Sequence, residues 1–189
     1  VVSGEKSIRS AGDGHAILKA HNLDYDIFLK LTESMSISAG EYAIFIDQDL
    51  CFHSDYIYHG LTTGVTPEKY FPAICNGIRE ISDALNVDML IAAHPRISYR
   101  RKGADYFEGI PVEYGKTAEL ISNCRFVVCH YSTAIQFAVL FKKPMIFVTT
   151  DELTASSLHG EFIAMFATIF GKSAINLDGD LDSVDWQKE

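Results

Sequence analysis

The clearest pattern in the chain is a series of short, continuous apolar runs that alternate with segments of helical periodicity. Four such runs cover 42–46, 89–93, 125–129 and 144–149. Strands that are apolar throughout and alternate with helices are typical of a parallel sheet covered on both faces. The pattern therefore predicts an α/β fold, a Rossmann-like doubly wound parallel sheet.

Local signals mark the helices between these runs. Thr66 is placed to cap a helix with Pro67 at its first position. Apolar residues then recur at helical spacing, at Phe71, Ile74, Ile78, Ile81 and Leu85. The remaining expected elements are a helix from Thr117 through Ile121, helices over 132–141 and 161–170, and a final strand over 174–177.

The pattern divides the chain into two parts. Residues 1–40 are expected to be a connecting segment, with a loop over 10–14, a helix over 15–21 and a polar connection over 34–40. Residues 41–189 carry the alternating runs and are expected to form the Rossmann-like domain. The chain contains no internal repeat and no low-complexity tract.

Composition narrows the classes of partner. The chain has 189 residues, 16 Lys and Arg against 25 Asp and Glu, and a formal net charge of −9. Such an acidic chain is a poor ligand for nucleic acids or anionic membranes, so no nucleic-acid partner and at most peripheral membrane association are expected. The longest apolar run, 162–170, is too short to span a bilayer.

The four cysteines favour a reducing compartment. Cys51, Cys75, Cys124 and Cys129 form no C-x-x-C pair and fit no zinc spacing. We therefore expect free thiols, no metal and a cytoplasmic location.

Three polar clusters follow three of the predicted strands. They are Asp47-Gln48-Asp49, His94-Pro95-Arg96 and His130-Tyr131-Ser132-Thr133. Ligands of open parallel sheets bind beyond the carboxyl ends of the strands, where these clusters would converge. The clusters therefore predict one binding site, with Asp47, Gln48 and Thr117 as candidate pocket residues.

The residue types favour an anionic ligand. Ser132 and Thr133, between a strand and a helix, suit a phosphate site, although both are also common helix caps. His94 at a strand end can donate to a phosphate oxygen or protonate a leaving group; a structural histidine is the alternative. Positive charge follows at Arg96 and over 100–102, where a solvated basic loop is the competing interpretation.

Other motifs are disfavoured. Asp47, Asp49, His53 and Asp55 fit no metal-ligand spacing, and carboxylates are common in strand-end loops. Gly115-Lys116-Thr117 is not a P-loop, because five residues rather than four separate Gly109 from Gly115; Thr117 is better explained as a helix cap. The dinucleotide fingerprint G-x-G-x-x-G and the hydrolase motif G-x-S-x-G do not occur.

The ordered series of strands and motifs resembles a known family. His94-Pro95, the Thr117-led helix with Glu119-Leu120-Ile121, the segment 127–134 and Lys143-Pro144-Met145-Ile146 are similar to the carboxyl-terminal half of GT-B glycosyltransferases. Within that fold, the chain most resembles bacterial surface-polysaccharide transferases of the sialyltransferase, polysialyltransferase and Kdo-transferase type. The resemblance covers roughly 41–153.

The resemblance implies a donor-binding domain for a CMP- or UDP-activated sugar in capsular or lipopolysaccharide synthesis. His94 would contact the donor phosphate and the leaving group, Ser132 and Thr133 would hold the phosphate, and Pro95, Arg96 and His130 would also bind the substrate. Inverting members usually need no metal or other cofactor. The acceptor glycan would bind an amino-terminal domain that residues 1–40 are too short to supply, so the chain is expected to be either a fragment that is inactive alone or a lone donor-binding module. It is expected to be cytoplasmic or peripheral to the inner membrane.

Two alternatives remain open. A nucleotide-sugar epimerase-like enzyme has the same layout, but would carry a Ser-Gly-Gly turn where this chain has Ser132-Thr133-Ala134. A nucleotide-binding module without chemistry of its own is the other alternative.

Overall fold

The computed structural model describes residues 17–18, 20–34, 40–53, 56, 58–60, 62–97, 99 and 103–188. The chain divides into two units, Val1–Ile37 and Ser38–Glu189. In the first unit, helix α2 (Leu23–Ser34) has Asp24 and Asp26 in its first turn, where carboxylates favour a helix start.

The second unit is built on a six-stranded sheet in which every neighbouring pair is parallel. Its strand order is β3-β2-β1-β4-β5-β6. The strands are β1 (Tyr42–Ile46), β2 (Asp88–Ala92), β3 (Val112–Glu113), β4 (Val127–Cys129), β5 (Met145–Thr149) and β6 (Ile175–Asn176). The order reverses between β1 and β4, the topological switch point where doubly wound sheets bind ligands.

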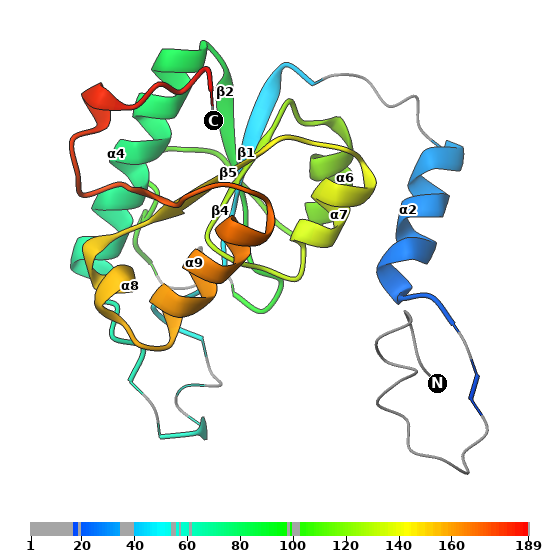
Figure 1. Cartoon of the computed structure of the whole chain (residues 1–189), viewed down its shortest axis with the longest axis horizontal. Coiled ribbons are helices and arrows are strands. Elements are labelled where there is room, and N and C mark those ends of the chain that lie inside the picture. The colour runs from blue at the N-terminus through cyan, green and yellow to red at the C-terminus, as the bar shows by residue number, and fades with distance from the viewer. Residues whose placement is uncertain are drawn as a thin grey trace. The chain divides into compact units, whose positions relative to one another are not determined.

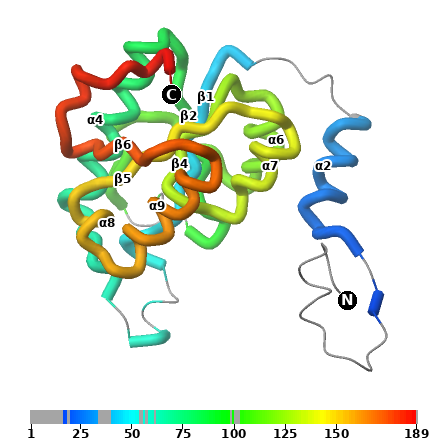
Figure 2. Tube along the Cα trace, viewed as in Figure 1, coloured from blue at the N-terminus to red at the C-terminus, as the bar shows by residue number. Residues whose placement is uncertain are grey.

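Helices cover the two faces of this sheet. Figure 1 shows α4 (Pro67–Leu85) on one side, and α6 (Thr117–Asn123) with α7 (Ile135–Leu140) on the other. Helices α8 (Asp151–Ala155) and α9 (His159–Ile169) connect β5 to β6, which lies beside β5 in Figure 2. A 3-10 turn, η1 (Leu181–Ser183), follows. The predicted α/β, Rossmann-like fold is confirmed.

The core explains the apolar runs. Ala43, Ile44 and Phe45 of β1 are fully buried, as are Ile74 and Ile81 of α4. A central strand covered on both faces has no solvent side, which is why β1 shows no alternation of polar and apolar residues.

Several predicted boundaries shift. The helix expected over 132–141 begins at Ile135, because residues 132–136 form a tight turn in which the N–H groups of Ile135 and Gln136 bond to the carbonyls of Ser132 and Thr133. Thr66 precedes α4 as expected, but its hydroxyl donates to Glu152 instead of capping the helix. Lys116 holds the N-cap position expected for Thr117.

Four of the described elements were not predicted: α2, β3, α8 and η1. The two-residue strand β3 pairs with β2 through Val112 beside Ile91, too short a run to give a strand pattern. In the amino-terminal unit, residues 17–18 and 20–22 are not helical, so the helix expected over 15–21 is wrong in its described part, and α2 lies beyond it. The expected loop over 10–14 lies outside the described residues.

Two further observations bear on the class of protein. The four cysteines are unpaired, and Cys75, Cys124 and Cys129 are buried. Burial raises the pKa of the Cys75 and Cys124 thiols to about 12, so neither is a reactive thiolate at neutral pH. Among the described helices, none combines the length and hydrophobicity that a bilayer-spanning segment needs.

Candidate functional site

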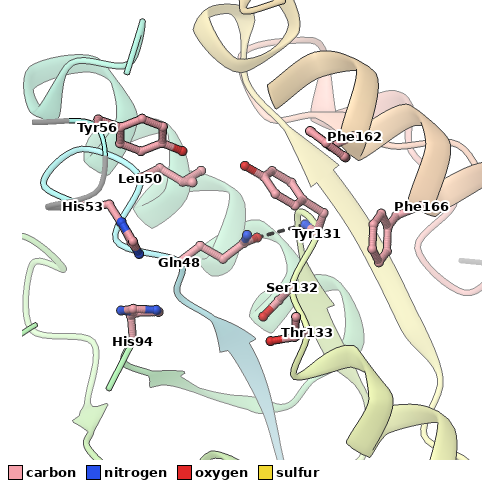
Figure 3. Close-up of a pocket in the computed structure, with 10 residues that line it drawn as sticks. All are labelled: Gln48, Leu50, His53, Tyr56, His94, Tyr131, Ser132, Thr133, Phe162 and Phe166. Atoms are coloured by element: carbon pink, nitrogen blue, oxygen red, sulfur yellow. Dashed lines mark hydrogen bonds between the residues drawn. The ribbon is translucent and has the colours of Figure 1, made fainter. Parts of the chain in front are cut away.

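A cavity of about 500 Å³ lies at the carboxyl-terminal edge of the sheet, over the switch point between β1 and β4. Its walls come from segments far apart in the sequence: the loops after β1, β2 and β4, and helix α9 (Figure 3). The residues that line it are Gln48, Leu50, His53, Tyr56, His94, Tyr131, Ser132, Thr133, Phe162 and Phe166.

Asp47 joins the loop after β1 to the loop after β2. Asp47 is 2% exposed, and its carboxylate accepts three hydrogen bonds, from the N–H of Asp49 at 3.0 Å, the N–H of His94 at 3.1 Å and the hydroxyl of Tyr99 at 2.9 Å. Burial raises the pKa of Asp47, and these hydrogen bonds oppose the rise. Asp47 therefore holds the His94 backbone from behind instead of facing the cavity.

Gln48 joins the same loop to the loop after β4. Its Oε1 accepts the N–H of Tyr131 at 2.9 Å, while its side chain lies in the cavity wall (Figure 3). The predicted pocket role of Gln48 agrees with this position, and Asp47 lies one layer deeper.

His94 lines the cavity from the end of β2. The N–H of Arg96 donates to its Nδ1 at a long 3.4 Å. This weak contact favours the tautomer in which Nε2 carries the proton and can donate. Pro95 and Arg96 are exposed beside His94 and do not line the cavity. The rest of the predicted basic segment, 100–102, lies outside the described residues.

Ser132 and Thr133 line the cavity opposite His94, and their hydroxyl oxygens point toward its side in Figure 3. The Oγ of Ser132 accepts the N–H of Ala134 at 3.2 Å, which leaves its own hydroxyl proton to donate. Within the described part of the chain, the Thr133 hydroxyl has no hydrogen-bond partner. The backbone N–H groups of Ala134, Ile135 and Gln136 are bonded inside the turn.

His130 is not part of the cavity. It is fully buried, with Nδ1 2.7 Å from the carbonyl oxygen of Val148 and Nε2 3.0 Å from the hydroxyl of Tyr70. Both ring nitrogens are therefore used by the core, and the prediction that this side chain holds a ligand is corrected. Thr117 begins α6 and does not line the cavity either.

An aromatic wall, formed by Tyr131, Phe162 and Phe166, closes the other side of the cavity. The rings of Tyr131 and Phe162 stack with centroids 5.6 Å apart, and Phe166 lies 6.3 Å from Tyr131. The Tyr131 hydroxyl bonds to Nδ1 of the buried His159 at 2.7 Å, which fixes its ring. Burial raises the pKa of Tyr131 and lowers that of His159, so both are neutral at pH 7.

Sequence reasoning missed this wall. Phe162 and Phe166 lie four residues apart on one face of α9, a spacing that any core helix shows. In the sequence, Tyr131 stands out only as part of the cluster His130-Tyr131-Ser132-Thr133, and His53 only as a disfavoured metal ligand. Asp55, weighed with His53, lies outside the described residues. Among the described residues, no cluster of three or more metal-ligating side chains occurs.

The site is a pocket with one polar side and one aromatic side, at the ligand-binding position of a doubly wound sheet. Among the described residues that line it, none carries a carboxylate or an ammonium group. It can donate hydrogen bonds to an anionic group and cover a flat apolar ring. No protein-family model and no curated protein matches the chain.

Proposed function

We propose that the chain is the donor-binding domain of a metal-independent GT-B glycosyltransferase that uses a CMP- or UDP-activated sugar in bacterial capsular or lipopolysaccharide synthesis. One observation carries the proposal: His94 and the pair Ser132 and Thr133 face one another across a cavity at the switch point of a parallel sheet. The enzyme would work in the cytoplasm or at the inner face of the membrane, with the glycan acceptor on a second domain.

The polar side of the cavity suits the donor phosphate. The Ser132 and Thr133 hydroxyls supply two donors, and each hydrogen bond to a charged oxygen contributes about 1.5–3 kcal/mol. The aromatic wall suits the nucleobase, because Tyr131, Phe162 and Phe166 offer an apolar surface beside these hydroxyls. A nucleotide presents the same combination of an anionic group and a flat ring.

His94 would act on the leaving group. When the bond between sugar and phosphate breaks, negative charge grows on the phosphate oxygens. An Nε2–H donor strengthens its hydrogen bond as that charge grows, which lowers the transition state more than the ground state. Because a nucleotide is already a good leaving group, no complete proton transfer is required, and the described lining residues include no carboxylate.

The test is calorimetric titration with CMP and UDP in the presence of EDTA. Wild-type protein is expected to bind at least one of them, and Ser132→Ala/Thr133→Ala is expected to bind it at least tenfold more weakly. The matched control is Thr168→Ala/Ser173→Ala, which removes the same two hydroxyl types from exposed positions outside the cavity.

Two results would contradict the proposal. One is nucleotide binding that the Ser132→Ala/Thr133→Ala variant retains in full; the other is the absence of binding to either nucleotide. In the complete two-domain enzyme, His94→Ala is expected to lower kcat more than donor affinity. Release of a free epimerised sugar nucleotide without an acceptor would instead indicate the epimerase-like alternative.

A further inference from the structure

A second histidine faces the cavity beside His94. His53, from the loop after β1, and His94, from the loop after β2, both line the cavity, and their ring centroids are 5.2 Å apart. His53 also packs edge-on against Tyr56, with centroids 5.9 Å apart, so its ring is supported on both sides. We call His53 and His94 the imidazole pair.

The imidazole pair and the hydroxyls of Ser132 and Thr133 occupy opposite sides of the same cavity (Figure 3). Gln48 lies between them, and its Oε1 is already bonded to the N–H of Tyr131. The polar side of the cavity therefore has two separate sets of donor groups. One phosphoryl group needs only one of these sets, whereas a diphosphate presents two phosphoryl groups side by side.

The chemistry of the pair favours an anion over a metal ion. The N–H of Arg96 lies 3.4 Å from Nδ1 of His94, which favours the tautomer with its proton on Nε2, a hydrogen-bond donor. A structural or catalytic zinc site uses three or four protein ligands. The part of the lining that the structure describes offers two imidazoles and no carboxylate or thiol.

We propose that the imidazole pair is a second phosphoryl-binding subsite, so that the pocket selects a nucleoside diphosphate over the corresponding monophosphate. The inference rests on the proposed function and deepens it, because it assigns a role to His53 and narrows the donor to a sugar activated by a nucleoside diphosphate. Ser132 and Thr133 hold one phosphoryl group, and His53 and His94 hold the other.

The experiment compares matched ligands on matched variants. Calorimetric titrations in EDTA use the pairs UMP and UDP, CMP and CDP, GMP and GDP, and phosphate and pyrophosphate. The variants are His53→Phe, which keeps a ring against Tyr56 and His94, and His53→Gln, which keeps an N–H donor. His59→Phe is the control, because His59 is exposed in the same loop and does not line the cavity.

Wild-type protein and the His59→Phe control are expected to bind one diphosphate at least tenfold more tightly than its monophosphate, the effect of one charge-assisted hydrogen bond. His53→Phe is expected to lose this preference by weakening the diphosphate alone, and His53→Gln to retain part of it. Urea unfolding of each variant checks that it is folded. The inference is overturned if folded His53→Phe keeps the preference, if it weakens both ligands equally, or if pyrophosphate binds only after Zn²⁺ or Mg²⁺ is added.

The arms separate this inference from the proposed function. Pyrophosphate binding that depends on His53, without any nucleotide binding, would overturn the proposed function and support the imidazole pair. Nucleotide binding that depends on Ser132 and Thr133 but not on His53 would support the proposed function and overturn the role of the imidazole pair.

Discussion

Acidification should destabilise the domain through the buried histidine His130. Its neutral ring donates from Nδ1 to the Val148 carbonyl and accepts at Nε2 from the Tyr70 hydroxyl. Protonation would place a charge in the core, and Nε2 could no longer accept the hydrogen bond from the Tyr70 hydroxyl. Burial accordingly lowers the pKa of His130 from 6.5 to about 4.

The sign and size of the effect follow from this shift. In the unfolded chain His130 takes up a proton near its ordinary pKa of 6.5, whereas in the folded protein it does so only near 4. Its contribution to stability is therefore complete above pH 6.5 and is lost as the pH falls toward 4. A pKa lowered from 6.5 in the unfolded chain to about 4 in the folded protein corresponds to about 3 kcal/mol of unfolding free energy.

Urea unfolding at pH 7 and pH 4 measures this loss. His130→Phe keeps the ring volume but cannot be protonated, so it should be less stable than wild type at pH 7 and should lose about 3 kcal/mol less on acidification. Carboxylates titrate equally in both proteins and cancel in the comparison. His59→Phe, an exposed control, should lose as much as wild type. Equal losses in wild type and His130→Phe would refute the reasoning.

Two further predictions concern stability. Asp47→Asn should lower the free energy of unfolding, measured in urea, by about 1–3 kcal/mol, because the new NH₂ group must face one of the three groups that now donate hydrogen bonds to the carboxylate. Asp83→Asn, at an exposed position, is the control. An Asp47→Asn variant as stable as wild type would contradict this hydrogen-bond network. Gly77→Ala should also destabilise the domain, by about 1–3 kcal/mol despite the better helix propensity of alanine, because the added Cβ would lie 2.6 Å from Cδ2 of the buried Leu177. A higher Tm for Gly77→Ala would show that Leu177 moves aside freely.

Much of the sheet could be predicted because buried parallel strands leave a local signature. The first apolar run coincides with β1, and the second differs from β2 by one residue at each end. The start of α7 could not be predicted in the same way. Its onset depends on the Oγ of Ser132 bonding to the N–H of Ala134, and a side chain that competes with the helix is invisible to hydrophobic periodicity.

Some residues of the candidate site could likewise be predicted from the sequence, and others could not. His94, Ser132 and Thr133 could be placed because ligands of parallel sheets bind beside the residues just past the strand ends. His130 comes after β4 just as directly, yet its ring is directed into the core, where it bonds to Val148 and Tyr70. Whether a residue at a strand end faces the core or the ligand depends on its neighbours in space. The aromatic wall was beyond reach for a related reason, since Phe162 and Phe166 meet Tyr131 only through the packing of α9.

Two adjacent residues, Asp47 and Gln48, position the two polar sides of the pocket. Successive side chains of an extended chain point in opposite directions, so Asp47 can reach the loop after β2 while Gln48 reaches the loop after β4. The first bond positions the backbone of His94, and the second positions the residue before Ser132. The gap between the imidazole and the hydroxyls is therefore set by the end of β1 before any ligand enters. Such preorganisation lowers the entropic cost of binding, and it explains why a buried carboxylate with three donors is kept directly behind the site.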